Sequence, residues 1–377
     1  MRILFSLFCL LAPLLAENRT VLLIGVDGFR YDYADQYQAR NLLALRGKGA
    51  GVRTRSMMPS STFPNFYSMA TGLSPDRHGI VAMHFYDRGM RARFDYNVNG
   101  DDGRFYRGDP IWNRVKTGVY FWPGSAAEIN GKRPWQWFPY NAKTTHEEKI
   151  KTVLGWLALP EAERPRLAMI YFADVDEAAH RYGVESAETR AAVQKVDESV
   201  GRLLEEAGKA APGVDVVVVS DHGMIDVNTS VDLAKEANLE GFTVGGEFSM
   251  LMLYHPEPRR VQEVYLRLRN HDQRYKIIQR RNLPSPMSQD LLGRIGDLVI
   301  VPTKRPLLLY ADIKPPQRPR SLPKAMHGYN PKMKEMRGIC YAAGPHVKRR
   351  DVRAVKTTAD VNRLIEKLLE LPAAPRR

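Results

Sequence analysis

Three short apolar runs, each followed directly by acidic side chains, constrain the fold of this chain more than any other feature of its sequence. The runs and the groups that end them are Val21–Val26 before Asp27, Leu167–Ala173 before Asp174 and Asp176, and Val214–Ser220 before Asp221 and His222. Helical patterns lie between the runs, so we predict an α/β fold with a mainly parallel central sheet and helices on both faces. In such sheets ligands bind at the carboxyl ends of the strands, and we expect the acids to meet there.

Apolar spacing also locates elements outside these three runs. The patterns predict helices at Glu185–Ala207, Arg259–Arg269 and Ala359–Leu371, and strands at Phe248–Tyr254 and Leu298–Val301. Their bounds are the least certain part of such an interpretation, because helix and strand ends carry the weakest sequence signals.

Two segments interrupt the alternation of strands and helices. Residues 88–143 are rich in Gly, Trp, Tyr and Asn, which predicts a long surface excursion over the active edge. We interpret residues 240–323 as an inserted smaller lobe, which the Pro-rich stretch Pro315–Pro319 joins back to the core. The predicted organisation is therefore a catalytic core at 17–239, the lobe, and a return to the core at 324–377.

The first sixteen residues differ from the rest of the chain. Met1 and Arg2 give a short positive start, Ile3–Leu15 is almost wholly apolar, and Ala16 precedes polar residues. This pattern predicts a secretory signal peptide at 1–16, too short to span a membrane. The alternative is a buried N-terminal helix, but the segment has no amphipathic pattern. We expect an exported protein, periplasmic or secreted, with no transmembrane segment.

Cysteine usage agrees with a chain that is not built on disulfides. Cys9 belongs to the predicted signal peptide, which leaves Cys340 without an internal partner. Cys340 lies in an apolar run, and we expect a small core residue rather than a reactive thiol.

The formal net charge of +14 favours anionic partners without specifying one. Basic residues cluster at Arg259–Arg260, Lys276–Arg281 and Lys348–Arg350, and such clusters are usually solvated faces. The alternative is electrostatic attraction of an anionic substrate. The chain has no recognisable nucleic-acid-binding module, so we expect no dedicated nucleic-acid binding. The pattern leaves the oligomeric state open.

Carboxylates and imidazoles at the expected strand ends suit a metal site. Asp176 and His180 are four residues apart, on one face of a helical turn, and can reach one ion. Asp221 and His222 are adjacent and can serve different ions. Each signal alone is ambiguous, because a single His or an Asp-x-x-x-His pair is often structural. The whole set, which suits two Zn²⁺ ions or other first-row divalent metals, is Asp27, Asp176, Asp221, His180, His222 and His327.

Thr62 precedes a helical stretch that Gly72 closes, and two interpretations fit it. It can be the N-cap residue, with Pro64 in the first turn of the helix. It can also be a nucleophile, because a hydroxyl at a helix N-terminus lies in positive potential and a nearby metal ion lowers its pKa.

In order along the chain, these motifs resemble the nucleotide pyrophosphatase/phosphodiesterase family of the alkaline phosphatase superfamily. The similarity covers most of residues 21–346. The matching segments are Val21–Arg30, Pro59–Asn65, Thr71–Pro75, His78–Val81, Asp176–His180, Val219–Met224, His327–Tyr329 and Ala343–Pro345.

The resemblance implies an alkaline-phosphatase-like fold and a two-metal phosphodiesterase or pyrophosphatase that acts on a small-molecule nucleotide. Thr62 would attack phosphorus, form a phosphoryl-enzyme intermediate and act as an additional metal ligand. Phe63 and Tyr171 would present aromatic faces to a nucleobase, although ordinary apolar packing explains both. The implied ligand sets are Asp176, His180 and His327 for one zinc, and Asp27, Asp221 and His222 for the other.

The sequence departs from the family at Met83. Relatives carry an Asn there, twenty-one residues after the threonine, which donates a hydrogen bond to a phosphoryl oxygen. A thioether cannot donate, so activity is reduced or another group, such as His84, takes the role. Two alternatives stay open. One is hydrolysis of a choline-type phospholipid head group or a phosphonate at the same metals, since relatives use these metals on other esters. The other, which Met83 alone motivates, is a weakly active binding protein.

Overall fold

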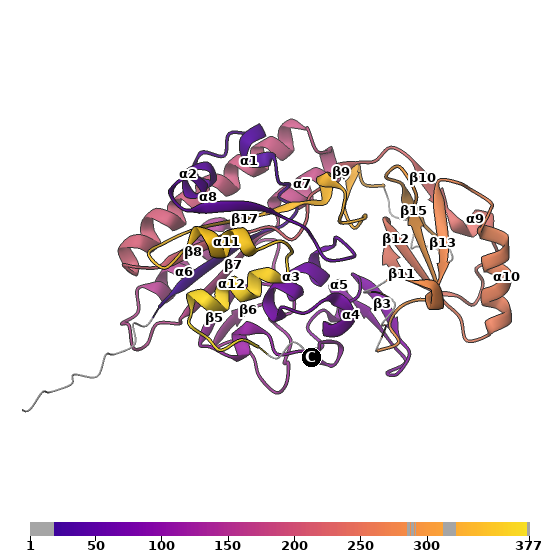
Figure 1. The fold of residues 1–377 in the computed structure, drawn as a ribbon, viewed down its shortest axis with the longest axis horizontal. Coiled ribbons are helices and arrows are strands. Elements are labelled where there is room, and N and C mark those ends of the chain that lie inside the picture. Colours follow the sequence, from indigo (N-terminus) through magenta and orange to yellow (C-terminus); the bar gives the residue numbers. More distant parts are fainter. Residues whose placement is uncertain (1–18, 285–286, 288–289, 291, 312–321, 375–377) are drawn as a thin grey trace, which may run out of the picture.

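The computed structural model describes residues 19–284, 287, 290, 292–311 and 322–374 (Figure 1). The predicted signal peptide at 1–16 and the Pro-rich stretch Pro315–Pro319 lie outside the described residues. Within them, no helix combines the length and the apolar character that crossing a membrane requires.

A seven-stranded sheet forms the centre of the described molecule, in the strand order β2-β17-β8-β1-β7-β5-β6. Only β17 runs antiparallel to its neighbours, which confirms the predicted mainly parallel sheet. The strands are β1 (Val21–Val26), β2 (Ala50–Thr54), β5 (Thr117–Tyr120), β6 (Gln136–Phe138), β7 (Leu167–Phe172), β8 (Asp215–Val219) and β17 (Gly338–Ala343). The three apolar runs are thus three adjacent strands, β8, β1 and β7.

Helices cover both faces of this sheet because successive side chains of each strand point to opposite sides. On β1, Leu22 and Ile24 belong to one buried core and Val21 and Leu23 to another. The first core includes side chains of α2 (Arg40–Lys48), α6 (His146–Leu157), α7 (Asp174–Tyr182) and α8 (Ala187–Ala210). The second includes side chains of α3 (Thr62–Thr71), α11 (Arg349–Ala354) and α12 (Asp360–Leu368) (Figure 1).

A second, antiparallel sheet lies at one end of the molecule, in orange in Figure 1. Its strands, in spatial order, are β11 (Thr243–Glu247), β12 (Met250–Tyr254), β14 (Leu298–Pro302) and β13 (Tyr275–Gln279). Helix α10 (Pro258–Leu268) buries Val264 and Leu268 in the core of this lobe. The domain bounds given above stay a prediction.

Short elements connect these layers. The helices are α1 (Tyr33–Gln36), α4 (Pro75–His78), α5 (Tyr96–Asn99) and α9 (Leu233–Glu236), with 3-10 turns η1 (Gly103–Phe105), η2 (Ile111–Asn113), η3 (Arg280–Asn282) and η5 (Lys334–Met336). The strands are β3 (His84–Asp87), β4 (Ala92–Asp95), β9 (Ile225–Asp226), β10 (Ser230–Asp232), β15 (Leu308–Tyr310) and β16 (Ala325–Met326).

The expectation of a surface excursion at 88–143 is wrong for much of that segment. Strands β5 and β6 within it belong to the central sheet, and Phe94, Phe105 and Trp122 are fully buried or nearly so. The sequence did not indicate this because each of these strands has only three or four residues, too few to show a period. Cys340, by contrast, is the buried core residue that its apolar run predicted.

Candidate active site

The acids predicted at the strand ends do meet at the carboxyl edge of the sheet. Asp27 directly follows β1, and Asp221 and His222 come two and three residues after β8. Asp176 lies on α7, which begins two residues after β7. His327 arrives from the far end of the chain because β16, which it follows, pairs with β9.

One group of donor atoms consists of Asp27, Asp221 and His222, all fully buried or nearly so. Their ligand atoms lie within 4.8 Å of one another. His222 Nε2 is 3.0 Å from Asp221 Oδ2 and 3.5 Å from Asp27 Oδ1. The structure therefore brings together the three residues that the resemblance assigned to one metal.

The second group surrounds Asp176. His180 Nε2 is 3.3 Å from Asp176 Oδ2, and His327 Nε2 is 3.8 Å from Asp176 Oδ1. The donor atoms that lie within 4.8 Å of one another here belong to Asp176, His222 and His327, and His180 is not part of that group. His222 thus stands between the two groups, with its ring stacked on His327 at a centroid distance of 3.8 Å. The assignment of His180 as the third ligand stays a prediction.

Backbone carbonyl groups fix the orientation of all three imidazoles. The Nδ1 atoms of His180, His222 and His327 lie 2.8, 2.9 and 3.1 Å from the carbonyl oxygens of Ala325, Gly223 and Ser60. Since a carbonyl oxygen only accepts, each Nδ1 carries the proton. The Nε2 lone pair of each ring is left to face the site, the usual arrangement of a metal-ligating histidine.

Carboxylates that are buried or partly buried near one another are costly without a cation, and here Asp27 and Asp221 are buried and Asp176 is partly buried. Burial, reinforced by the charges of Asp221 and Asp176, raises the pKa of Asp27 well above its ordinary value. In addition, Asp176 Oδ1 and Asp221 Oδ2 are buried and have no hydrogen-bond partner among the described residues. Carboxylates and neutral imidazoles in this arrangement fit divalent metal ions.

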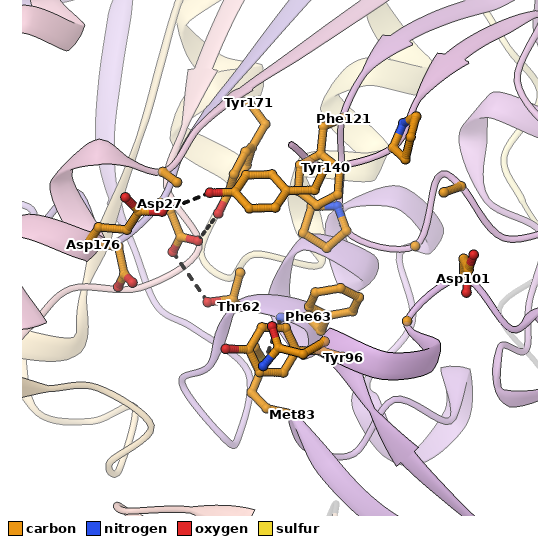
Figure 2. Close-up of a pocket in the computed structure, with 18 of the residues that line it drawn as sticks. Asp27, Thr62, Phe63, Met83, Tyr96, Asp101, Phe121, Tyr140, Tyr171 and Asp176 are labelled. Carbon is orange, nitrogen blue, oxygen red and sulfur yellow. Dashed lines mark hydrogen bonds between the residues drawn. The ribbon is translucent and has the colours of Figure 1, made fainter. Parts of the chain in front are cut away.

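Thr62 is the first residue of α3, and its hydroxyl lies against the first group. Its Oγ1 is 3.4 Å from Asp27 Oδ1 (Figure 2). The same oxygen is 3.3 Å from His222 Nε2. The N-cap interpretation is wrong, because Ser61 occupies the N-cap position and Thr62 already has its place in the first turn. Gly72 ends the helix as expected, in the left-handed conformation. The Thr62 hydroxyl is therefore directed to the carboxylates and not to the backbone of its helix.

A cavity of about 630 Å³ opens beside Thr62. Phe63 and Tyr171 both line it, but Tyr171 is only 5% exposed and its hydroxyl donates to Asp27 Oδ2. Phe121 and Tyr140 line the same cavity, with their rings 4.7 Å apart, and Tyr140 is 42% exposed. Phe63 is itself only 7% exposed, so the more accessible rings belong to Phe121 and Tyr140, which the sequence did not single out. Neither carries a spacing signal that would have revealed it.

Met83 also lines the cavity, next to Phe63 and Thr62 (Figure 2). Its Sδ accepts a 3.4 Å hydrogen bond from the backbone N–H of Phe63. His84, the alternative donor, is not among the residues that line this cavity, and its Nδ1 lies 3.4 Å from Asp95 Oδ2. The described geometry therefore gives His84 no place beside Thr62.

Glu247, at the end of β11, is a cavity residue that sequence reasoning missed. Its Oε2 is buried and has no hydrogen-bond partner among the described residues. Burial raises its pKa to about 7, while His180 opposes that shift and Asp176 adds to it. The second lobe thus contributes a carboxyl group to the cavity.

Residues 21–330 match the family model described as type I phosphodiesterase / nucleotide pyrophosphatase. The chain belongs to this family. Ectonucleotide pyrophosphatase/phosphodiesterase family member 1 of Mus musculus is 39% identical over 221 residues, 55% of this chain and 24% of that protein. Family member 3 of Rattus norvegicus is 31% identical over 385 residues, 95% of this chain and 43% of its own. The chain thus spans less than half the length of these relatives.

The solved structures agree on the fold. Murine ectonucleotide pyrophosphatase/phosphodiesterase 5 superimposes with a TM-score of 0.86 at 24% identity, covering 95% of this chain and 97% of its own. A second structure of that murine protein, with a TM-score of 0.86 at 23% identity, is described as an inactive threonine-to-alanine variant in complex with AMP. The alkaline-phosphatase-like fold expected from the sequence is confirmed.

Proposed function

We propose that this protein is an exported two-metal phosphodiesterase that hydrolyses nucleotide phosphodiester or phosphoanhydride bonds with Thr62 as its nucleophile. The observation that carries the proposal is the position of the Thr62 hydroxyl. It lies at the N-terminus of α3 and within 3.4 Å of two members of the first donor group. The family to which the chain belongs supports the reaction class.

The reaction follows from this position. Thr62 Oγ1 attacks phosphorus in line with the leaving oxygen, its proton passes to Asp27 Oδ1, which accepts from the hydroxyl, and the P–O bond to the leaving oxygen breaks. The leaving oxygen takes a proton from solvent water and departs as an alcohol, or it departs as phosphate. Water then attacks the same phosphorus from the side opposite Thr62 and loses a proton to solvent, the P–O bond to Thr62 breaks, and Thr62 Oγ1 takes back the proton from Asp27. The N-terminus of α3 adds positive potential where charge develops on the phosphoryl oxygens.

We infer that two Zn²⁺ ions, or other first-row divalent ions, bind here. Asp27, Asp221 and His222 would hold one ion, and Asp176, His180 and His327 the other, with Thr62 as a further ligand. When bound, such ions neutralise phosphoryl charge and lower the pKa of the hydroxyl and water nucleophiles.

A small planar group fits the ring-lined part of the cavity. Phe63 on one side and Phe121 and Tyr140 on the other provide faces for a nucleobase, while Tyr171 orients Asp27 instead. The AMP complex of the murine relative is consistent with such an occupant, and the inactivity of its threonine-to-alanine variant is consistent with a threonine nucleophile.

The test is a pair of Thr62 variants assayed with added Zn²⁺. The substrates are bis-p-nitrophenyl phosphate, a dinucleotide, a nucleoside triphosphate, a choline phosphodiester and the monoester p-nitrophenyl phosphate. Thr62→Ala should lower kcat on diesters by ~10³-fold or more, whereas Thr62→Ser, which keeps the hydroxyl, should retain part of it. Because Thr62 makes no capping bond, Thr62→Ala should stay folded, and its free energy of unfolding should fall by no more than ~1 kcal/mol for the lost hydrogen bond to Asp27. An active Thr62→Ala protein would remove Thr62 from the mechanism.

A further inference from the structure

We propose that the cavity selects its substrate by charge, accepting phosphodiesters of uncharged or cationic groups and disfavouring phosphoanhydrides with polyanionic leaving groups. This inference rests on the proposed function, since it concerns the substrate of the same site. The starting observation is the charge of the cavity wall. Among the described residues that line it, none is Lys or Arg, although the whole chain carries a formal net charge of +14.

The acids in that wall include three that the metal scheme does not use, and they stand in different places. Asp101 lies at the end opposite Asp176, with aromatic rings between them (Figure 2). Glu177 stands at the Tyr140 side and accepts a 2.8 Å hydrogen bond from the Tyr140 hydroxyl. Glu247 enters from the second lobe, next to His180 and Asp176. A leaving group that extends towards Asp101, Glu177 or Glu247 therefore meets an acidic side chain.

The aromatic rings between these acids favour the same uncharged or cationic groups. Phe63, Tyr96, Phe121 and Tyr140 line the space between Thr62 and Asp101. Aromatic faces attract flat uncharged groups and cations, and they offer nothing to a phosphate. A single phosphoryl charge is met at the metal-ligand end, but a second or third phosphate would lie among rings and carboxylates. Because the described part of the cavity wall contains no Lys or Arg near these rings and acids, no cationic side chain of that kind offsets the repulsion there.

Reversing the charge of one acid should therefore change the preference. The measurement is kcat/KM for the dinucleoside monophosphate ApA and for ATP, determined with Zn²⁺ at low ionic strength. Wild-type protein should favour ApA. Asp101→Lys and Glu247→Gln should each raise the ATP-to-ApA ratio of kcat/KM, Asp101→Lys by about tenfold, and added salt should shrink this change.

Glu161→Lys is the matched control. Glu161 is exposed and lies in the loop before β7, at the sheet edge opposite the site, so its reversal changes the net charge equally without facing the cavity. The ratio should stay at the wild-type value. Metal content is measured for every variant, so that a lost ion is not read as altered selectivity.

Binding separates this inference from the proposed function. Calorimetry with ApA and ATP on the Thr62→Ala protein, with and without Asp101→Lys, reports the same preference without turnover. Absence of turnover of either compound by the wild type would overturn the proposed function alone. Tighter ATP than ApA binding by Thr62→Ala protein, or a ratio that Asp101→Lys and Glu161→Lys shift equally, would overturn the charge selection.

Discussion

Met83 is the residue at which this chain departs most clearly from what its family resemblance implies. The thioether is 5% exposed, lines the cavity and accepts from the Phe63 backbone N–H. An asparagine here can keep that acceptor through its Oδ1 while its Nδ2 donates into the cavity. We therefore interpret Met83 as the loss of a donor that the family resemblance implies at this position.

We expect Met83→Asn to raise kcat/KM for phosphodiesters. Restoring one hydrogen bond to a transition-state oxygen contributes up to ~10²-fold in rate, and a repacked pocket would deliver less. Initial rates on bis-p-nitrophenyl phosphate, with metal content measured in parallel, check this. A rate equal to or below the wild type would contradict it.

Two further variants test whether a rate gain at residue 83 comes from the added donor. Met83→Leu preserves volume and removes the acceptor for Phe63 without adding a donor, so it should not accelerate turnover. His84→Ala should leave the rate within about twofold of the wild type, because His84 lies against Asp95 and outside the cavity lining. Strong loss in His84→Ala would restore His84 as the substitute donor.

Sequence reasoning found the site residues that follow clear apolar strands or lie in recognisable motifs, and it missed Glu247, Phe121 and Tyr140, which have neither signal. The acids after β1, β7 and β8 were predictable because an apolar run and a polar stop are both local signals. Glu247 and Tyr140 come from an inserted strand and an irregular loop, where only the tertiary fold decides what faces the cavity. The N-cap error at Thr62 has a similar origin, since Ser61 and Thr62 are both good caps by composition.

At the scale of elements, the contact between β1 and α3 sets the position of the nucleophile. Gly25, the last but one residue of β1, faces Phe66 of α3 and Trp122. A Cβ atom placed on Gly25 would lie 2.8 Å from a ring atom of each. No other residue type therefore lets the helix that carries Thr62 approach the strand that carries Asp27 so closely.

Gly25→Ala should consequently destabilise the fold by ~1–3 kcal/mol, the usual cost of overpacking, and reduce kcat by shifting α3. Chemical denaturation and kinetics on one diester measure the two effects. Gly47→Ala in α2 is the matched control: no atom lies within 4 Å of its Cβ position, and Ala is the better helix former. It should be neutral or stabilising by up to ~1 kcal/mol. Equal effects of the two changes would refute the packing argument.

The same scale explains which parts of the fold were predictable. Strands β1, β7 and β8 and helices α8, α10 and α12 lie within a few residues of their predicted bounds, because long apolar periods survive tertiary context. Strands β5 and β6 join the sheet through Val119 and its neighbours in a segment dominated by aromatic and glycine residues. These two strands form because they pair with the central sheet, and no local sequence pattern indicates them.

At the scale of the whole molecule, the second lobe is tied to the core next to the site. Arg294 is fully buried, its Nε lies 2.6 Å from Asp87 Oδ2, and one of its terminal nitrogens lies 2.8 Å from the Gly79 carbonyl oxygen. Asp87 ends β3, the strand that directly follows Met83. This ion pair holds the lobe that carries Glu247 against the core that carries Thr62, so the two parts form one cavity.

The carboxylates at the centre of this assembly should make the stability of the whole molecule depend on bound cations. Asp27, Asp176 and Asp221 repel one another in a buried setting, and ions that bind only the folded state stabilise it by mass action. We expect two metal ions per chain after mild dialysis, and chelation should lower the free energy of unfolding by ~2–4 kcal/mol per site at saturating metal.

Asp221→Asn should lower both metal content and Tm, whereas Asp109→Asn, which changes an exposed acid, should change neither. Elemental analysis and thermal unfolding with and without chelator measure these effects. Full activity with one ion or none would defeat the two-metal scheme, and an unchanged Tm after complete removal of metal would show that the carboxylates are stabilised by another means.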